Sequence, residues 1–149
     1  MLRDMHEIAA GEIADKVRAE MVARDRASRG LGFQVMDVQP GRATVRVTVR
    51  DDMLNAHDVC HGGLIAALAD SAFGFACNSY NELAVAMGFE IDIVAPARLG
   101  DVLTARCAEV SRTRRTGVYD VDVTNQRGQR IAVFRGRSYT IKGTPSVSD

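Results

Sequence analysis

The order of hydrophobic patterns along this chain predicts an α+β fold, in which one antiparallel sheet covers a single apolar helix. Two stretches with strand character precede the helical stretch at residues 64–79, and four follow it. Residues 43–50 alternate small apolar side chains, mostly valine, with threonine and arginine, the period of two typical of a half-buried strand. The connections between strands are short, which favours antiparallel neighbours in one sheet.

The first expected element is an extra N-terminal helix. Apolar side chains recur at helical spacing over residues 2–26, and Gly11 is the residue that could interrupt them. The sequence SRGLG at residues 28–32 breaks the pattern, so we assign residues 1–28 to this helix. Turn signals then separate strands expected around residues 33–35, 43–50, 83–95, 102–110, 117–125 and 130–141. Residues 144–149 are expected to form a loose tail of one domain that spans residues 1–149.

The composition is that of an ordinary soluble globular protein and excludes some partners. The chain is 46% hydrophobic and 26% charged, and nineteen basic residues balance nineteen acidic ones. No net field would therefore attract a polyanion, and without tryptophan there is little material for stacking bases. We expect no nucleic-acid partner.

The cysteines and the N-terminus indicate a cytoplasmic location. Three cysteines form an odd number without paired spacing, which fits a reducing compartment better than a disulfide scaffold. Charges every few residues over the first 25 positions leave no apolar run for a signal peptide or a membrane span. We expect no membrane partner.

Asp70 is the most informative residue, because it is an acid on the most apolar helix. Its helical neighbours cannot pair with a carboxylate: they are Ala66, Ala67, Phe73 and Gly74. A carboxylate on a buried helix is costly unless something receives it. Asp70 therefore lies either on an exposed stripe or in a cleft, where it could act as a base or as a nucleophile.

Two glycines, Gly62 and Gly63, stand where this helix is expected to begin. The free N–H groups of a helix start, together with the helix dipole, can bind a developing oxyanion, and glycine lets a ligand approach the backbone closely. The alternative is that both glycines only make a tight turn into a packed helix.

Polar residues in the preceding loop allow several interpretations. Asn55 and His61 could orient a water or support the glycine N–H groups, and Asn55 could equally close a turn. His57, Cys60 and His61 suggest a metal site, but they lack the spaced pairs and the fourth ligand of structural zinc. A Cys60–His61 nucleophile pair is disfavoured, because adjacent residues in an extended loop point in opposite directions.

Three arginines lie in one short turn, at Arg112, Arg114 and Arg115. Their guanidinium groups could hold the phosphates of a nucleotide-tailed molecule such as coenzyme A. A charged, exposed turn between two strands explains them equally well.

Two segments closely resemble a known family. MLNAHDVCHGGLIAALADSAFGFACNSYN (residues 53–81) and GVYDVDVTNQRGQRIAVFRGRSYTI (residues 117–141) are similar to the hotdog-fold acyl-CoA thioesterases of phenylacetate degradation, the PaaI type. The likeness runs from about Gly32 to Gly143. It implies a hotdog fold, with an antiparallel sheet wrapped around one long central helix. It also implies metal-independent hydrolysis of acyl-CoA, with no cofactor besides the coenzyme A of the substrate.

The resemblance also assigns roles to individual residues. The catalytic acid of the family falls on Asp70 and its oxyanion glycine on Gly62, while Asn55, His61 and Ser71 match its supporting residues. Phenylacetyl-CoA and its ring-hydroxylated relatives are the implied substrates. A thioesterase for another acyl-CoA and a non-catalytic acyl-CoA binding module remain alternatives. The motif of the related hotdog dehydratases is not present.

The spacing of Gly62 and Asp70 suggests a site shared between two chains. Eight positions along one helix correspond to roughly 12 Å, too far for one reacting carbonyl to contact both groups. Two copies with antiparallel helices, related by a two-fold axis, could bring Gly62 of one copy beside Asp70 of the other. The resemblance agrees, because hotdog thioesterases build sites at dimer interfaces and often pair their dimers into tetramers.

Overall fold

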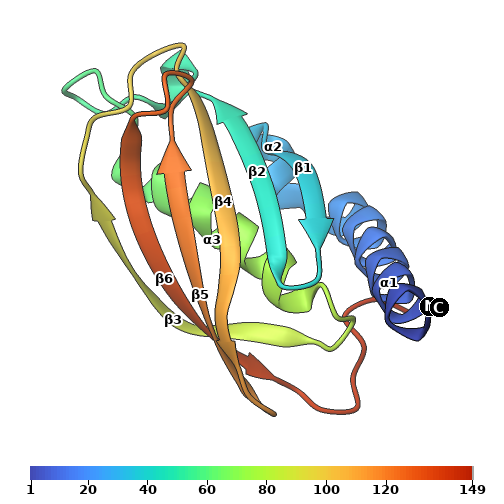
Figure 1. Cartoon of the computed structure of the whole chain (residues 1–149). Coiled ribbons are helices and arrows are strands. Elements are labelled where there is room, and N and C mark those ends of the chain that lie inside the picture. Colours follow the sequence, from blue (N-terminus) through green and yellow to red (C-terminus); the bar gives the residue numbers. More distant parts are fainter. Residues whose placement is uncertain (149) are drawn as a thin grey trace.

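The computed structural model describes residues 1–148, in which one antiparallel sheet wraps around a central helix (Figure 1). The predicted α+β architecture is confirmed. The sheet order is β1-β2-β4-β5-β6-β3. The strands are β1 (Gln34–Gln39), β2 (Arg42–Thr48), β3 (Ala84–Ile93), β4 (Val102–Arg112), β5 (Thr116–Thr124) and β6 (Arg130–Thr140).

The place of β3 differs from the expectation that strands close in the chain are neighbours in the sheet. That expectation holds for β1 with β2, for β4 with β5 and for β5 with β6, but β3 pairs with β6 and not with β4. The reason is the central helix, α3 (Gly62–Asn78), which carries the chain from β2 across the concave face to the far edge of the sheet (Figure 1). As a result, β3 is an edge strand.

The concave face of the sheet is filled by α3, which contacts every strand. Its Phe73 ring packs at tilted angles against Tyr119 of β5 and Phe134 of β6, with centroids 5.6 and 5.9 Å away. A Cβ atom on Gly136 would lie 3.0 Å from the ring of Phe73, so the sheet comes as close to the helix as glycine allows. The hydrophobic core lies between these two layers.

The N-terminal region forms two helices rather than the single helix predicted for residues 1–28. The first, α1 (Leu2–Arg24), passes through Gly11 without interruption. At Asp25 the chain leaves helical geometry, and its carboxylate caps a new short helix, α2 (Arg26–Leu31), by accepting the N–H of Ser28 at 2.9 Å. The signal for this break was an N-cap acid three positions before the serine.

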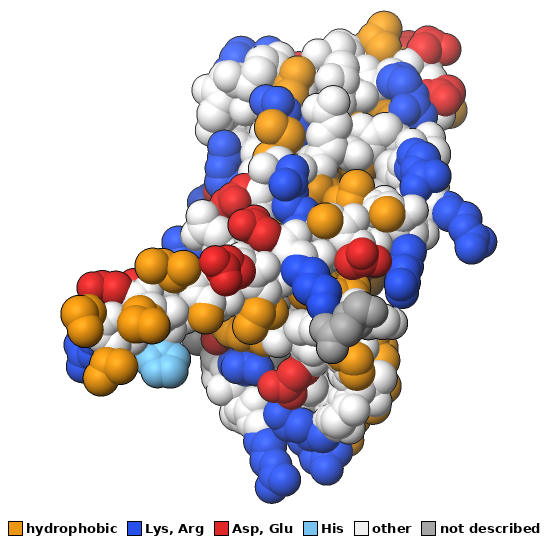
Figure 2. Space-filling view, turned by 90° about the vertical axis from the view of Figure 1, so that its right-hand side faces the viewer, with side chains coloured by type: hydrophobic (Ala, Val, Ile, Leu, Met, Phe, Trp, Pro, Cys, Tyr) orange, Lys and Arg blue, Asp and Glu red, His pale blue; other side chains and the backbone are white. Residues whose placement is uncertain are grey.

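Only part of α1 is covered by the body of the protein. Ala14 and Val17 are its buried residues, and they face the side that packs against β1. The beginning of the helix projects from the body, and Figure 2 shows hydrophobic side chains on this projection. Met1, Leu2, Met5 and Ile8 are all more than half exposed there.

The expectation of a loose tail is wrong for residues 144–148. Val147 is buried, and its N–H donates to the side chain of Asn81 at 3.0 Å. The hydroxyl of Ser146 donates to Asn78, a buried residue that also bonds the backbone of Ala84. The tail therefore closes the junction between the end of α3 and the start of β3. Asp149 lies outside the described residues.

Candidate active site

Asp70 lies in a small cavity of about 190 Å³ between α3 and α2. The cavity contains no residue of β2–β6; its walls are Asp25, Ala27, Ser28, Leu31, Phe33, Ala67, Asp70 and Ser71. Asp70 is half-buried, and among residues 1–148 its carboxylate has no hydrogen-bond or ion-pair partner. Burial raises the pKa of this carboxyl above its usual range. Of the two sequence alternatives, Asp70 therefore faces a cleft.

Ser71 lies beside Asp70 in the same wall, and its hydroxyl oxygen is 3.2 Å from that of Ser28. The hydroxyl of Ser28 in turn donates to the Asp25 carboxylate at 2.6 Å. The structure thus adds Asp25 and Ser28 to the surroundings of the acid. Neither was predicted from the sequence, because both were assigned to the end of a helix with no contact to residue 70.

At the start of α3, the structure distinguishes the two glycines. His61 is the N-cap, and its Nδ1 accepts the N–H of Gly63 at 3.3 Å. The N–H groups of Leu64 and Ile65 bond to the carbonyl of His61. Within residues 1–148, the N–H of Gly62 is therefore the one among these first helical groups that is left without a partner. This favours Gly62 as an oxyanion donor and disfavours Gly63.

Gly62 opens onto a second cavity, of about 370 Å³, between the loop before α3 and the chain after β3. A Cβ atom on Gly62 would lie 2.9 Å from Cδ1 of Ile93, the last residue of β3. Asn55 lines the same cavity. Its Oδ1 accepts the N–H of His57 at 2.9 Å and so closes a turn, while its amide N–H₂ has no partner among the described residues and could donate to a ligand.

One chain does not bring Gly62 and Asp70 together. The two cavities share no residue: Asn55 and Gly62 line the larger one, and Asp70 and Ser71 line the smaller one. His61 lies at the helix start, close to the larger cavity. The predicted site residues thus form two separate groups along α3.

The thiol and metal interpretations find no support. Cys60 is buried, and burial raises the pKa of its thiol, which keeps it protonated and a poor nucleophile. Its sulfur faces the carbonyl of His61 rather than the ring. Within residues 1–148, no three His, Cys, Asp or Glu side chains gather as metal ligands.

The arginine turn joins β4 to β5, close to the end of α3 that is opposite to Gly62 (Figure 1). Arg112 stacks on the ring of Tyr80 at 3.8 Å and pairs with Glu82 at 3.3 Å. Arg115 donates to the hydroxyl of Tyr139 at 3.2 Å. Arg114 is exposed, and it has no partner among the described residues. Two of the three guanidinium groups therefore already have partners within the chain.

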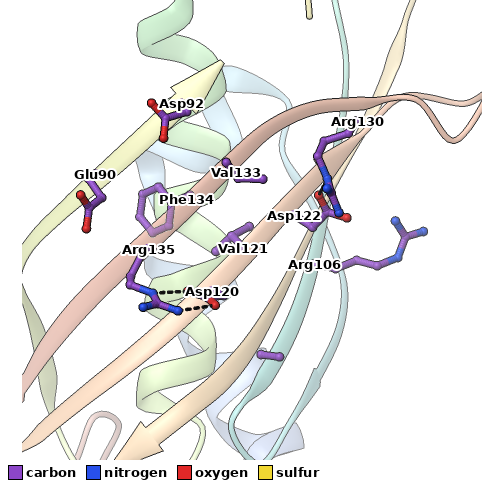
Figure 3. A pocket seen from close by; sticks show the side chains of 11 residues that line it. Glu90, Asp92, Arg106, Asp120, Val121, Asp122, Arg130, Val133, Phe134 and Arg135 are labelled. Carbon is purple, nitrogen blue, oxygen red and sulfur yellow. Dashed lines mark hydrogen bonds and ion pairs between the residues drawn. The ribbon is translucent and has the colours of Figure 1, made fainter. Parts of the chain in front are cut away.

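A larger cavity lies elsewhere, on the outer face of the sheet (Figure 3). It measures about 570 Å³ and contains none of the predicted site residues. Its charges are largely paired: Arg135 donates twice to Asp120, at 2.7 and 2.8 Å, and Arg130 bonds Asp122 at 2.8 Å. Size alone therefore does not mark the site.

Comparisons with known proteins show the family of this chain. Residues 57–132 match the family model described as the thioesterase superfamily. The acyl-coenzyme A thioesterase PaaI of Escherichia coli is 42% identical over 124 residues, which cover 83% of this chain and 89% of that protein.

Solved structures give the same result. The E. coli PaaI structure, from a phenylacetic acid degradation operon, superposes with a TM-score of 0.88 at 40% identity, over 90% of this chain and 97% of that one. The structure of a mutant of the phenylacetic acid degradation protein PaaI from Thermus thermophilus superposes with a TM-score of 0.76 at 38% identity. The match covers 78% of this chain and 100% of that one. The structure of a Streptococcus mutans protein bound to acetyl-CoA superposes with a TM-score of 0.71 at 31% identity. The match covers 73% of this chain and 88% of that one. The chain therefore belongs to the thioesterase superfamily, as a hotdog-fold acyl-CoA thioesterase of the PaaI type.

Proposed function

We propose that this thioester hydrolase acts on phenylacetyl-CoA, or on ring-hydroxylated phenylacetyl-CoA, and releases the free acid and CoA in phenylacetate catabolism. The names of the E. coli and T. thermophilus relatives, which refer to phenylacetic acid degradation, support this substrate class. The observation that carries the hydrolytic assignment is the carboxylate of Asp70, which has no partner within the described part of the chain and lies in a partly apolar cavity beside Leu31 and Phe33. A module that only binds acyl-CoA would gain nothing from such a group, which is costly to bury.

The proposed chemistry divides between the two ends of the site. The thioester carbonyl accepts the free N–H of Gly62, which stabilises the oxyanion as it develops. Asp70 either attacks the carbonyl carbon or takes a proton from an attacking water. His61 holds the turn through Gly63, and the amide of Asn55 can donate to the substrate. No cofactor is needed in this scheme, since coenzyme A enters as part of the substrate.

We propose that two chains share each site across a two-fold axis. The separation of the Gly62 and Asp70 cavities supports this, because one chain does not bring the two groups into the same cavity. The edge strand β3 supports it too: it has one partner strand, and its side chains Val85, Met87, Phe89 and Ile93 are 44–56% exposed. Ile93 at the end of β3 lies against Gly62, so pairing through this edge would place the second chain beside the oxyanion donor.

A dimer of dimers and a cytoplasmic location complete the proposal. The exposed apolar side chains on the projecting start of α1 offer a further surface for assembly into tetramers. Three free, buried thiols suit a reducing compartment. No helix among the described residues is long and apolar enough to cross a membrane.

The substrate proposal predicts a preference that one assay can measure. We expect kcat/KM to be higher for phenylacetyl-CoA and a ring-hydroxylated phenylacetyl-CoA than for acetyl-CoA or a long-chain acyl-CoA, with free CoA followed by a thiol reagent. Hydrolysis that favours a straight-chain substrate would move the assignment to another acyl group. Tight binding of phenylacetyl-CoA without release of CoA would support the binding module instead.

The Asp70→Asn variant should lower kcat at least about a hundredfold, the scale of losing a catalytic base. It should also raise the melting temperature at neutral pH, because a neutral amide replaces a desolvated carboxylate. Since burial raises the folded-state pKa of Asp70, this gain is complete above that pKa and vanishes below the unfolded pKa. The matched control is Asp92→Asn, at an exposed carboxylate on the outer sheet face, which should change neither quantity. Near wild-type turnover in Asp70→Asn would make Asp70 a structural residue.

Complementation tests the shared site. Gly62→Pro removes the free N–H at the first helical position, where the backbone geometry suits proline, and its ring must displace the side-chain end of Ile93. Inactive Gly62→Pro chains, mixed in equal amounts with inactive Asp70→Asn chains and allowed to exchange, should recover about a quarter of wild-type activity, since half of the dimers are mixed and each has one working site. No recovery despite demonstrated exchange would mean that each chain carries its own site.

Arg114 is the arginine of the turn that remains available for the phosphates of coenzyme A. Arg114→Ala should raise KM and weaken its dependence on salt, while kcat stays nearly constant, because the ground state and the transition state lose the same binding free energy. The control is Arg106→Ala, at an exposed arginine on the outer sheet face. If KM is equal in the two variants and the wild type, the turn does not contact the substrate.

A further inference from the structure

The contacts between α2 and Ser71 have a fixed direction. The carboxylate of Asp25 can only accept hydrogen bonds. Its Oδ1 accepts the backbone N–H of Ser28 at 2.9 Å, and its Oδ2 accepts the hydroxyl of Ser28 at 2.6 Å. A serine has one hydroxyl proton. The proton of Ser28 is therefore committed to Asp25.

The hydrogen bond of Ser71 also has a fixed direction. The two serine oxygens lie 3.2 Å apart, and Ser28 has no second proton to give, so Ser71 must be the donor. The proton of Ser71 then points toward α2, while its lone pairs remain available to the cavity that it shares with Asp70. The wall around Asp70 thus presents two acceptors side by side.

We propose that Asp25 and Ser28 are positioning residues, which keep Ser71 a hydrogen-bond acceptor so that the hydrolytic water is held by two acceptors. This inference rests on the proposed thioesterase chemistry of Asp70. The water directs one O–H to the Asp70 carboxylate and the other to the oxygen of Ser71, which leaves a lone pair for the thioester carbonyl.

In the reaction, the bond between water oxygen and carbonyl carbon forms as the first proton moves to Asp70. Collapse of the tetrahedral adduct breaks the carbon–sulfur bond, and Asp70 returns a proton to the thiolate of CoA. Ser71 gains and loses no proton. Of the two routes open to Asp70, this arrangement selects general-base catalysis.

Capping of α2 does not require the hydroxyl of Ser28. The bond from the Ser28 N–H to Asp25 Oδ1 already satisfies the N-cap. The hydroxyl of Ser28, a residue only 9% exposed, adds a link from that cap to the residue next to the catalytic acid. The ionisable neighbours of Asp70 are Asp25, the N-cap of α2, and Cys77, two turns along α3. Burial raises the pKa of the Cys77 thiol to about 12, so it stays neutral.

Two variants should change the direction of the hydrogen bonds between Ser71, Ser28 and Asp25 without removing Ser71. Ser28→Ala deletes the acceptor, and the freed proton of Ser71 can then turn to Asp70. Asp25→Asn keeps a capping oxygen but presents N–H₂ to Ser28, which reverses the chain of donors. A hydrogen bond to its charged form lowers a carboxyl pKa. In both variants we expect the acid limb of kcat/KM to move to lower pH and kcat to fall roughly tenfold, with KM nearly unchanged.

A double variant and a control separate positioning from a merely structural role. If Ser28 acts through Ser71, Ser28→Ala should cause no further loss of kcat in a Ser71→Ala background. Ser79→Ala is the matched control, because this buried hydroxyl at the other end of α3 also donates to one group, Ala76, and accepts from another, Gly41. It should lower the melting temperature and leave the acid limb in place. An unmoved acid limb in Ser28→Ala and Asp25→Asn, or additive losses in the double variant, would overturn the proposal.

Two readouts keep this inference distinct from the proposed function. Infrared titration of the Asp70 carboxyl, identified by its absence in Asp70→Asn, measures its pKa without turnover. A lower pKa in Ser28→Ala, in a protein that releases no CoA, would support the hydrogen-bond direction and refute the thioesterase. Single-turnover hydrolysis in oxygen-18 water should leave Asp70 unlabelled. Label in its carboxylate would mean that Asp70, not water, attacks, and would refute the role given to Ser71.

Discussion

The packing of α3 against one sheet constrains everything else in this structure. A sheet that curls around a helix must meet apolar side chains over most of the helix surface, and α3 supplies them on nearly every side. Phe73 and Gly136 show how little space is left between the two layers. A carboxylate can be placed only on the strip of α3 that the strands do not cover. That strip faces α2, which explains why the cavity around Asp70 has no wall from β2–β6.

Chemistry and stability therefore oppose each other at this strip. Asp70 has no partner among residues 1–148 and is half-buried, so its charged form is less stable than in water. The same desolvation brings the carboxyl closer to the pKa of an effective base. At the other end of the site, the ring of His61 accepts the N–H of Gly63, so that among the first N–H groups of α3 only that of Gly62 has no partner within residues 1–148. In both places the functional group is the one that the fold leaves unsatisfied.

Much of the fold and part of the site could be predicted from the sequence, because periodicity and local residue types carry that information. Strand alternation, the apolar helix and the isolated Asp70 are local patterns. The edge position of β3 is not, since it depends on the path that α3 takes across the sheet. Ser28 was missed for a similar reason: its contact with Ser71 joins residues 43 positions apart. The packing of the tail depends on its hydrogen bonds to Asn78 and Asn81, and no pattern within residues 144–148 predicts these contacts.

The placement of site groups in two cavities at different positions along α3 has a consequence for the protein in solution. If two chains complete each site, specific activity becomes a function of protein concentration, and dilution below the dissociation constant of the dimer silences the enzyme without unfolding it. Pairing through the edge of β3 then sets the protein concentration above which the enzyme is active. A substitution at Phe89, whose ring stacks on Phe134 4.9 Å away, would change that threshold while leaving the chemistry of assembled sites intact.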